Sequence, residues 1–181
     1  VIEYLVKLPH LCFISFPESY SNQQFITKQC LEKLTNLQDL VMLDLKGLEI
    51  DDEVISLLKH FKKLSILYLG ATNLEKISKI QNNEMKILKD IQSLQVLDLG
   101  MVQIPDKAIV YIEHLQNLKS LNLSYTGTSD DGIAFVSKIS NLKELDLLCT
   151  GITDKGLAHI SKLKKLNLLY LNITGVSDDG I

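Results

Sequence analysis

The stretch NLKELDLLCTGITDKGLAHISKLKKL, residues 141–166, contains the pattern that decides the fold. Leu142, Leu145 and Leu147 follow the spacing L-x-x-L-x-L, and the last two point to the same side of a short strand because they are two residues apart. Thr153 then stands at the expected N-cap of a helix, and apolar residues follow it at intervals of three. The stretch therefore predicts one unit made of a strand, a turn, a capped helix and a loop that returns the chain to the next strand.

The same unit recurs along the chain. The first strand leucine of each unit gives seven expected markers, at Leu11, Leu43, Leu67, Leu97, Leu121, Leu145 and Leu169. Their intervals are 32, 24, 30, 24, 24 and 24 residues, so the basic period is 24. A period sustained over seven strands predicts a solenoid, in which each repeat buries its apolar face against its neighbours. We expect residues 1–181 to form a single domain of about seven repeats.

Both ends of the sequence fall inside a repeat. Ile2, Leu5 and Leu8 occupy apolar positions at the end of a helix whose own strand would precede the sequence. Residues 176–181 reproduce the beginning of the helix that starts near Thr153. We therefore expect the sequence to be truncated within a repeat at both ends.

The L-x-x-L-x-L spacing and the segment ITDKGL, residues 152–157, resemble leucine-rich repeat proteins. The segment is similar to repeats of bacterial leucine-rich proteins and of the F-box type, which usually carry Cys where this sequence has Thr150. The resemblance implies an α/β leucine-rich repeat solenoid, or horseshoe, with a parallel sheet on the concave side and helices on the convex side. It specifies architecture and no single reaction, because such repeats serve many partners.

Composition argues against nucleic-acid binding and against a membrane span. The formal net charge is -3, and all 19 positive residues are lysines, with no arginine in the chain. Specific base recognition depends on bidentate arginine, and phosphate binding needs a basic stripe. No run of about 18 apolar residues occurs, so we expect no transmembrane helix.

Residues that could carry chemistry are few and scattered. In the predicted stack, Cys12 and Cys149 are five strand spacings of about 4.8 Å apart, and Cys30 lies on a helix, so we expect free thiols and a cytoplasmic location. None of the cysteines is followed two residues later by Asp, as in the Cys-x-Asp motif of bacterial leucine-rich ubiquitin ligases. The histidines lack partners at metal-ligand spacing. We predict no enzyme activity, no metal and no cofactor.

Side chains that alternate with the buried strand leucines should face the concave side, where nothing from the same repeat covers them. The apolar ones among them, Met42, Ile66, Tyr68 and Val96, are predicted to form a contiguous exposed patch. In the first repeat, the equivalent positions before, between and after the two strand residues that face the core are His10, Cys12 and Ile14. The candidate partner-binding residues are Met42, Asp44, Ile66, Tyr68, Val96, Asp98, Asn122, Glu144, Asp146 and Tyr170. Apolar patches with a polar border commonly mark interaction sites, although parallel strands also favour such residues for packing.

Two intervals longer than 24 residues indicate insertions between strand and helix. Eight extra residues are expected within residues 18–25 and six within residues 75–80, both at the same edge of the sheet. Candidate contacts in these loops are Tyr20, Phe25 and Lys76. Insertions in solenoids often lie on the binding face, and tolerated loop drift is the other interpretation.

These observations predict a non-enzymatic, monomeric scaffold that binds a protein partner on its concave face. The resemblance implies two contexts. The first is a bacterial effector that acts on a host protein in the host cytosol. The second is the substrate-recognition module of a ubiquitin ligase, whose F-box or catalytic segment would lie outside this sequence.

Overall fold

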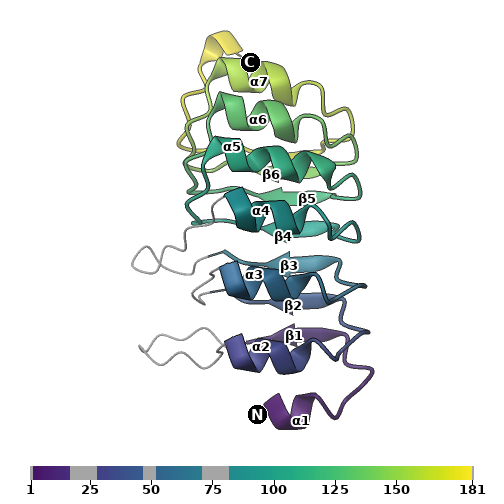
Figure 1. The fold of residues 1–181 in the computed structure, drawn as a ribbon. Coiled ribbons are helices and arrows are strands. Elements are labelled where there is room, and N and C mark those ends of the chain that lie inside the picture. The colour runs from purple at the N-terminus through teal and green to yellow at the C-terminus, as the bar shows by residue number, and fades with distance from the viewer. Residues whose placement is uncertain (1, 17–27, 47–51, 71–81, 181) are drawn as a thin grey trace.

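A computed structural model of the chain describes residues 2–16, 28–46, 52–70 and 82–180. Within these ranges seven strands form one parallel sheet in the order of the sequence. Figure 1 shows the strands stacked in one layer and the helices in a second layer, from the N-terminal to the C-terminal end. The strands are β1 (Phe13–Ser15), β2 (Met42–Asp44), β3 (Ile66–Tyr68), β4 (Val96–Asp98), β5 (Ser120–Asn122), β6 (Glu144–Asp146) and β7 (Leu168–Tyr170). The predicted solenoid with a parallel sheet is confirmed.

A helical segment follows each strand and packs on the same side of the sheet (Figure 1). The fourth repeat differs from the others, because its α-helix begins after Pro105 and continues as a 3-10 helix. The side chains of Ser129 and Thr153 cap two of the helices, as expected for Thr153. The segments are α1 (Ile2–Leu5), α2 (Lys28–Leu34), α3 (Asp52–Leu58), α4 (Asn82–Leu88), α5 (Asp106–Ile109), η2 (Val110–His114), α6 (Asp130–Val136), α7 (Asp154–Ile160) and η3 (Asp178–Gly180).

The core runs between the two layers along the whole stack. In repeat 6, numbered by its strand, Leu142, Leu145 and Leu147 are all 0% exposed. The residues on either side of Leu145 are only half-buried, so burial alternates along the strand. The same alternation occurs in β2, β3 and β5. The sheet therefore has one face on the core and one face turned away from the helices.

The first repeat departs from the expected alignment by three residues. Ile14, and not Leu11, lies opposite Leu43 in the sheet, and Ile14 is 5% exposed. Consequently His10 and Cys12 precede the strand, and Ile14 belongs to the core instead of the concave side. The concave positions of β1 are occupied by Phe13 and Ser15.

The shift has a physical reason in the return turn that precedes each strand. The Leu142 N–H donates to the Ile139 carbonyl at 3.1 Å, and the Leu11 N–H donates to the Leu8 carbonyl at 3.0 Å. Leu11 of the first repeat is therefore the equivalent of Leu142 in repeat 6. The strand marker follows three residues later, at Ile14.

The insertions are confirmed in part by the lengths of the connections. Seven residues connect β2 to α3 and β6 to α7, whereas 12 connect β1 to α2 and 13 connect β3 to α4. The insertion in repeat 3 is therefore six residues, as predicted, and that in repeat 1 is five instead of eight. The candidate loop residues Tyr20, Phe25 and Lys76 lie outside the described residues.

A ladder of carboxylates joins the starts of successive helices. The Thr153 N–H donates to Asp130 Oδ1 at 2.8 Å, and the Thr153 hydroxyl donates to Asp130 Oδ2 at 2.6 Å. Asp154 receives the same two bonds from Ser177. Burial raises the pKa of Asp130, but the hydrogen bonds from Thr153 and from the Gly156 N–H outweigh it, so the pKa lies below the usual 3.8.

We expect Asp130→Asn to reduce the dependence of stability on acid pH. Because the folded-state pKa of Asp130 is lowered, its charge contributes stability that is fully present above the unfolded pKa, near 4. This contribution is lost as the pH falls through the folded-state pKa. Denaturant unfolding at several pH values should show that wild type exceeds the variant at neutral pH and that the difference shrinks in acid.

Asp131→Asn is the matched control, because Asp131 is exposed and its carboxylate is outside the ladder. It should follow the wild-type pH profile closely. A difference between wild type and Asp130→Asn that stayed constant down to the lowest pH would contradict the proposed role of the charge.

Candidate functional site

The face of the sheet turned away from the helices carries a continuous apolar row. The sheet register places Phe13 beside Met42, Met42 beside Ile66, and Ile66 beside Val96. Adjacent strands lie about 4.8 Å apart, so these four side chains, here called the apolar row, extend over roughly 14 Å. Beyond β4 the row becomes polar, with Ser120 on β5 and Glu144 on β6.

Exposure within the apolar row differs from the prediction. Met42, Ile66 and Val96 are half-buried instead of exposed, because side chains in register on adjacent strands shield one another. Phe13 is 59% exposed and was missed, since the alignment of the first repeat placed it on the core side. The alternating pair Ile14 and Phe16, which matches the strand pair of every other repeat, was the signal that could have found it.

A second row of side chains runs parallel to the apolar row, at the last residue of each strand. Its Asp and Asn members accept hydrogen bonds from backbone N–H groups two residues further on. Asp98 Oδ1 accepts from Gly100 at 2.9 Å, and Asp146 Oδ1 accepts from Leu148 at 2.9 Å. Asp44 and Asn122 make equivalent bonds. These residues therefore close the turn after the strand, a structural role that the sequence analysis did not assign to them.

The centre of the second row is held together by a lysine. Lys46 Nζ lies 2.9 Å from Asp98 Oδ2 and 4.5 Å from the centroid of the Tyr68 ring. Burial lowers the pKa of Lys46, but the hydrogen bond and charge of Asp98, together with Asp44, outweigh it and raise the pKa. Lys46 therefore stays protonated and fixes Tyr68 beside the apolar row. Asp98 is only 8% exposed and offers little surface to a partner.

The acidic end of the sheet face lies on β6. Glu144 and Asp146 are half-buried and point to the same side, because they are two residues apart on one strand. Glu144 Oε2 accepts a hydrogen bond from the Ser120 hydroxyl at 3.0 Å. Within the part of the chain that the structure describes, neither carboxylate has an ion-pair partner. Beyond them Tyr170, on β7, is 40% exposed.

All ten strand residues predicted as partner contacts thus lie on one face of one sheet. Three of them, Met42, Ile66 and Val96, form the apolar row with Phe13. The other seven form the second row and the acidic end. What the arrangement offers is a surface for binding, with an apolar half and an acidic half.

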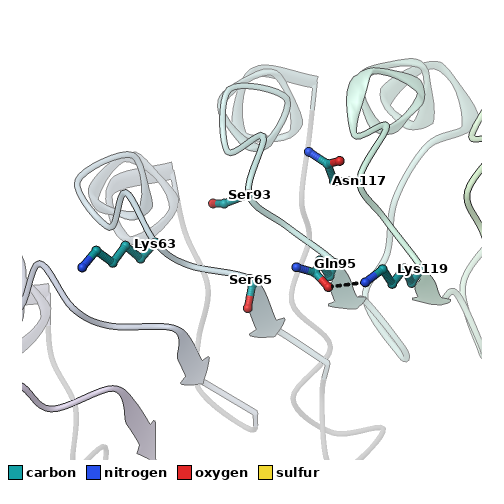
Figure 2. Close-up of a pocket in the computed structure, with 6 residues that line it drawn as sticks. All are labelled: Lys63, Ser65, Ser93, Gln95, Asn117 and Lys119. Atoms are coloured by element: carbon teal, nitrogen blue, oxygen red, sulfur yellow. Dashed lines mark hydrogen bonds between the residues drawn. The ribbon is translucent and has the colours of Figure 1, made fainter.

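A polar hollow of about 550 Å³ lies at a different place, where the chain enters β3, β4 and β5 (Figure 2). It is lined by Lys63, Ser65, Ser93, Gln95, Asn117 and Lys119. Several of these side chains are already paired within the protein. Lys119 Nζ donates to Gln95 Oε1 at 2.7 Å, and Lys63 Nζ donates to Asp39 Oδ1 at 2.6 Å. The hollow is therefore a seam between adjacent repeats, and it lies outside the apolar row.

Across the described ranges, no group of three His, Cys, Asp or Glu side chains is placed to hold a metal ion. No helix in those ranges is long and apolar enough to cross a membrane. Cys12, Cys30 and Cys149 are half-buried and form no disulfide.

Residues 114–137 and 138–161 match a family model described as "Leucine Rich repeat". These two segments correspond to the ends of repeats 4 and 5 with the strands and helices that follow. The fold is that of a leucine-rich repeat solenoid. This confirms the resemblance inferred from the sequence, and such repeats generally serve as non-enzymatic scaffolds for protein binding. No curated protein matches the chain in sequence.

Solved structures show the same fold at low sequence identity. An internalin (inlF) from Listeria monocytogenes is 20% identical, with a TM-score of 0.60, over 91% of this chain and 49% of that one. A leucine-rich repeat protein of Leptospira interrogans is 20% identical, with a TM-score of 0.61, over 98% of this chain and 47% of that one. TLR13, solved in a complex with ssRNA13, is 23% identical, with a TM-score of 0.66, over 97% of this chain and 24% of that one. The chain thus spans half or less of each of these proteins.

Proposed function

We propose that this chain binds a protein partner on the concave face of its sheet, centred on the apolar row and Tyr68. The observation that carries the proposal is the register, which gathers Phe13, Met42, Ile66 and Val96 from four repeats into one row on the face that the helices leave uncovered. Apolar side chains with a polar border favour protein contacts. No single repeat could provide such a surface.

The charges of this face favour a protein over a nucleic acid. Its second row contains Asp44, Asp98 and Asp146, and Glu144 continues the apolar row, whereas nucleic-acid binding requires a basic stripe. TLR13 was solved with an RNA, but it shares only the fold with this chain. We expect binding of a polyanion to this face to be unfavourable.

Tyr68→Ala should weaken binding to the concave face more than about fivefold, that is, by more than about 1 kcal/mol. The ring stands beside the apolar row and is held there by Lys46. As a probe we suggest a peptide selected from a random display library on the whole chain. Its dissociation constant would be measured by fluorescence anisotropy for wild type and variant.

Tyr4→Ala is the matched control, because it removes the same side chain from α1, where Tyr4 is 74% exposed. It should leave the affinity unchanged. If selected peptides bound with the same affinity to both variants as to wild type, the partner site would lie elsewhere and the proposed function would be wrong.

The biological context is a separate proposal. An effector that captures a host protein, acting in the host cytosol, and the recognition module of a ubiquitin ligase are both compatible with a monomeric binding scaffold. The internalin and the Leptospira protein are each 20% identical and share the fold with this chain, so they favour neither context over the other. Reading the gene on both sides of this segment would test them, because an F-box or a ligase domain would indicate the second.

A further inference from the structure

The concave face carries charge of mainly one sign. Four carboxylates lie on the described part of this face, and only one ammonium group lies among them. The carboxylates belong to Asp44, Asp98, Glu144 and Asp146, and the ammonium belongs to Lys46. The face is therefore acidic before any partner approaches.

The single cation is already neutralised. Lys46 Nζ pairs with Asp98 Oδ2 at 2.9 Å and lies over the Tyr68 ring, so it has little charge left for a partner. Asp44 is beside this cluster, and its Oδ2 accepts from the Ser15 hydroxyl at 3.0 Å. One ammonium offsets one carboxylate, so three carboxylates remain on this face. Of these, Asp44 lies beside Lys46, whereas Glu144 and Asp146 lie together on β6 with no ion-pair partner among the described residues.

These two carboxylates are held in place by the fold. Asp146 Oδ1 is fixed by the Leu148 N–H, and Glu144 Oε2 by the Ser120 hydroxyl. Each of them keeps a second oxygen for which the described residues supply no hydrogen-bond donor. Both side chains are half-buried, so a docked partner would cover the part that is still exposed and would remove the water bound there. A partner without a positive charge at this place would leave two desolvated carboxylates with no compensating charge, which is unfavourable.

We propose that the partner of the concave face is a basic polypeptide segment, with apolar side chains on the apolar row and lysine or arginine on Glu144 and Asp146. The inference rests on the proposed function, because it names the chemistry of the partner at that same surface. Glu144 lies two strand spacings from Val96, or about 10 Å, so one short segment can reach both. Screening at physiological salt limits charge effects to roughly 8 Å, so the basic group must make direct contact.

The first test uses a random peptide display library on the whole chain. Selected peptides should be enriched in lysine or arginine next to aliphatic or aromatic residues, and their binding should weaken as salt is raised. Enrichment of acidic peptides would overturn the inference. So would binding that is independent of salt.

The second test measures one selected peptide on variants that remove charge and keep shape. In Asp146→Asn the amide can still accept from Leu148, as Asn122 already accepts from Ser124 in the preceding repeat. Glu144→Gln can likewise keep the bond from Ser120. Together the two changes should weaken binding about tenfold. Asp131→Asn, which removes an exposed charge from α6, is the control and should have no effect.

Double-mutant cycles make the result specific. Replacing the basic residue of the peptide by norleucine should abolish the effect of the charge variants, because the interaction is then already lost. If Tyr68→Ala weakens the peptide but the two charge variants do not, the inference fails and the proposed function stands. If none of the three variants weakens it, the concave site itself is wrong.

Discussion

Leu145→Ala is expected to lower the free energy of unfolding by about 2 to 5 kcal/mol. Leu145 is 0% exposed, and it lies between Leu121 on β5 and Leu169 on β7. In a solenoid each repeat contacts only its neighbours, so the cavity opens in the interfaces that tie repeat 6 to the stack. Relaxation is limited because the strands on both sides fix the backbone.

Leu168→Ala is the matched control for this prediction. It makes the same chemical change on the next strand, but Leu168 faces the concave side and is 41% exposed. We expect it to cost less than about 1 kcal/mol. Both variants would be unfolded in urea and followed by circular dichroism. Similar midpoints for the two would mean that the faces of the sheet are assigned wrongly.

The faces of the sheet could be predicted from the sequence because two periodicities agree. Leucines two residues apart define the core side of each strand, and the interval of 24 residues brings equivalent positions into register. Every register pair from β2 to β7 joins residues that the sequence had aligned, such as Leu97 with Leu121. The concave rows followed directly from this alignment.

The first repeat could not be aligned with the same certainty, because its apolar residues recur at a constant spacing. Leu8, Leu11 and Ile14 are each three residues apart, so two of them can equally well begin the strand pattern. Tertiary contact decides between them, since the return turn needs Leu11. The error removed Phe13 from the predicted site, although it is the most exposed member of the apolar row.

The roles of the acidic residues were predicted only in part. Their position on the concave face followed from alternation along the strand, but their hydrogen bonds depend on the backbone of the next turn. Asp98 accepts from both Gly100 and Lys46, whereas Asp146 accepts only from Leu148 among the bonds described. Only the structure therefore shows which carboxylates have no cation partner within the protein and can pair with a binding partner.

The glycine at the third residue of several helical segments is another feature whose role the sequence predicted only in part. Gly132, Gly156 and Gly180 recur at this position, which indicates a need for a small residue. The structure shows what occupies the space. The carboxylate of Asp106 lies against Gly132, and Asp130 and Asp154 lie in the same way against the other two. The glycines therefore make room for the carboxylate ladder between repeats.

Gly132→Ala should accordingly destabilise the protein by about 1 to 3 kcal/mol. A Cβ at this position would lie 2.5 Å from Asp106 Oδ1 and 2.9 Å from Ile109 Cδ1. Asp106 cannot move away freely, because the Ser129 N–H donates to its Oδ1 at 3.0 Å and the Ser129 hydroxyl donates to its Oδ2. Either the ladder breaks or α6 shifts away from α5.

Gly127→Ala provides the control, because a Cβ there would meet nothing within 4 Å and the backbone is outside the left-handed region. It should be neutral, or stabilising by up to about 1 kcal/mol through the reduced entropy of the unfolded chain. The two variants would be compared by urea denaturation at neutral pH. If Gly132→Ala were as stable as Gly127→Ala, the carboxylate ladder could rearrange without loss of stability. Close packing of the helices would then not depend on a glycine at this position.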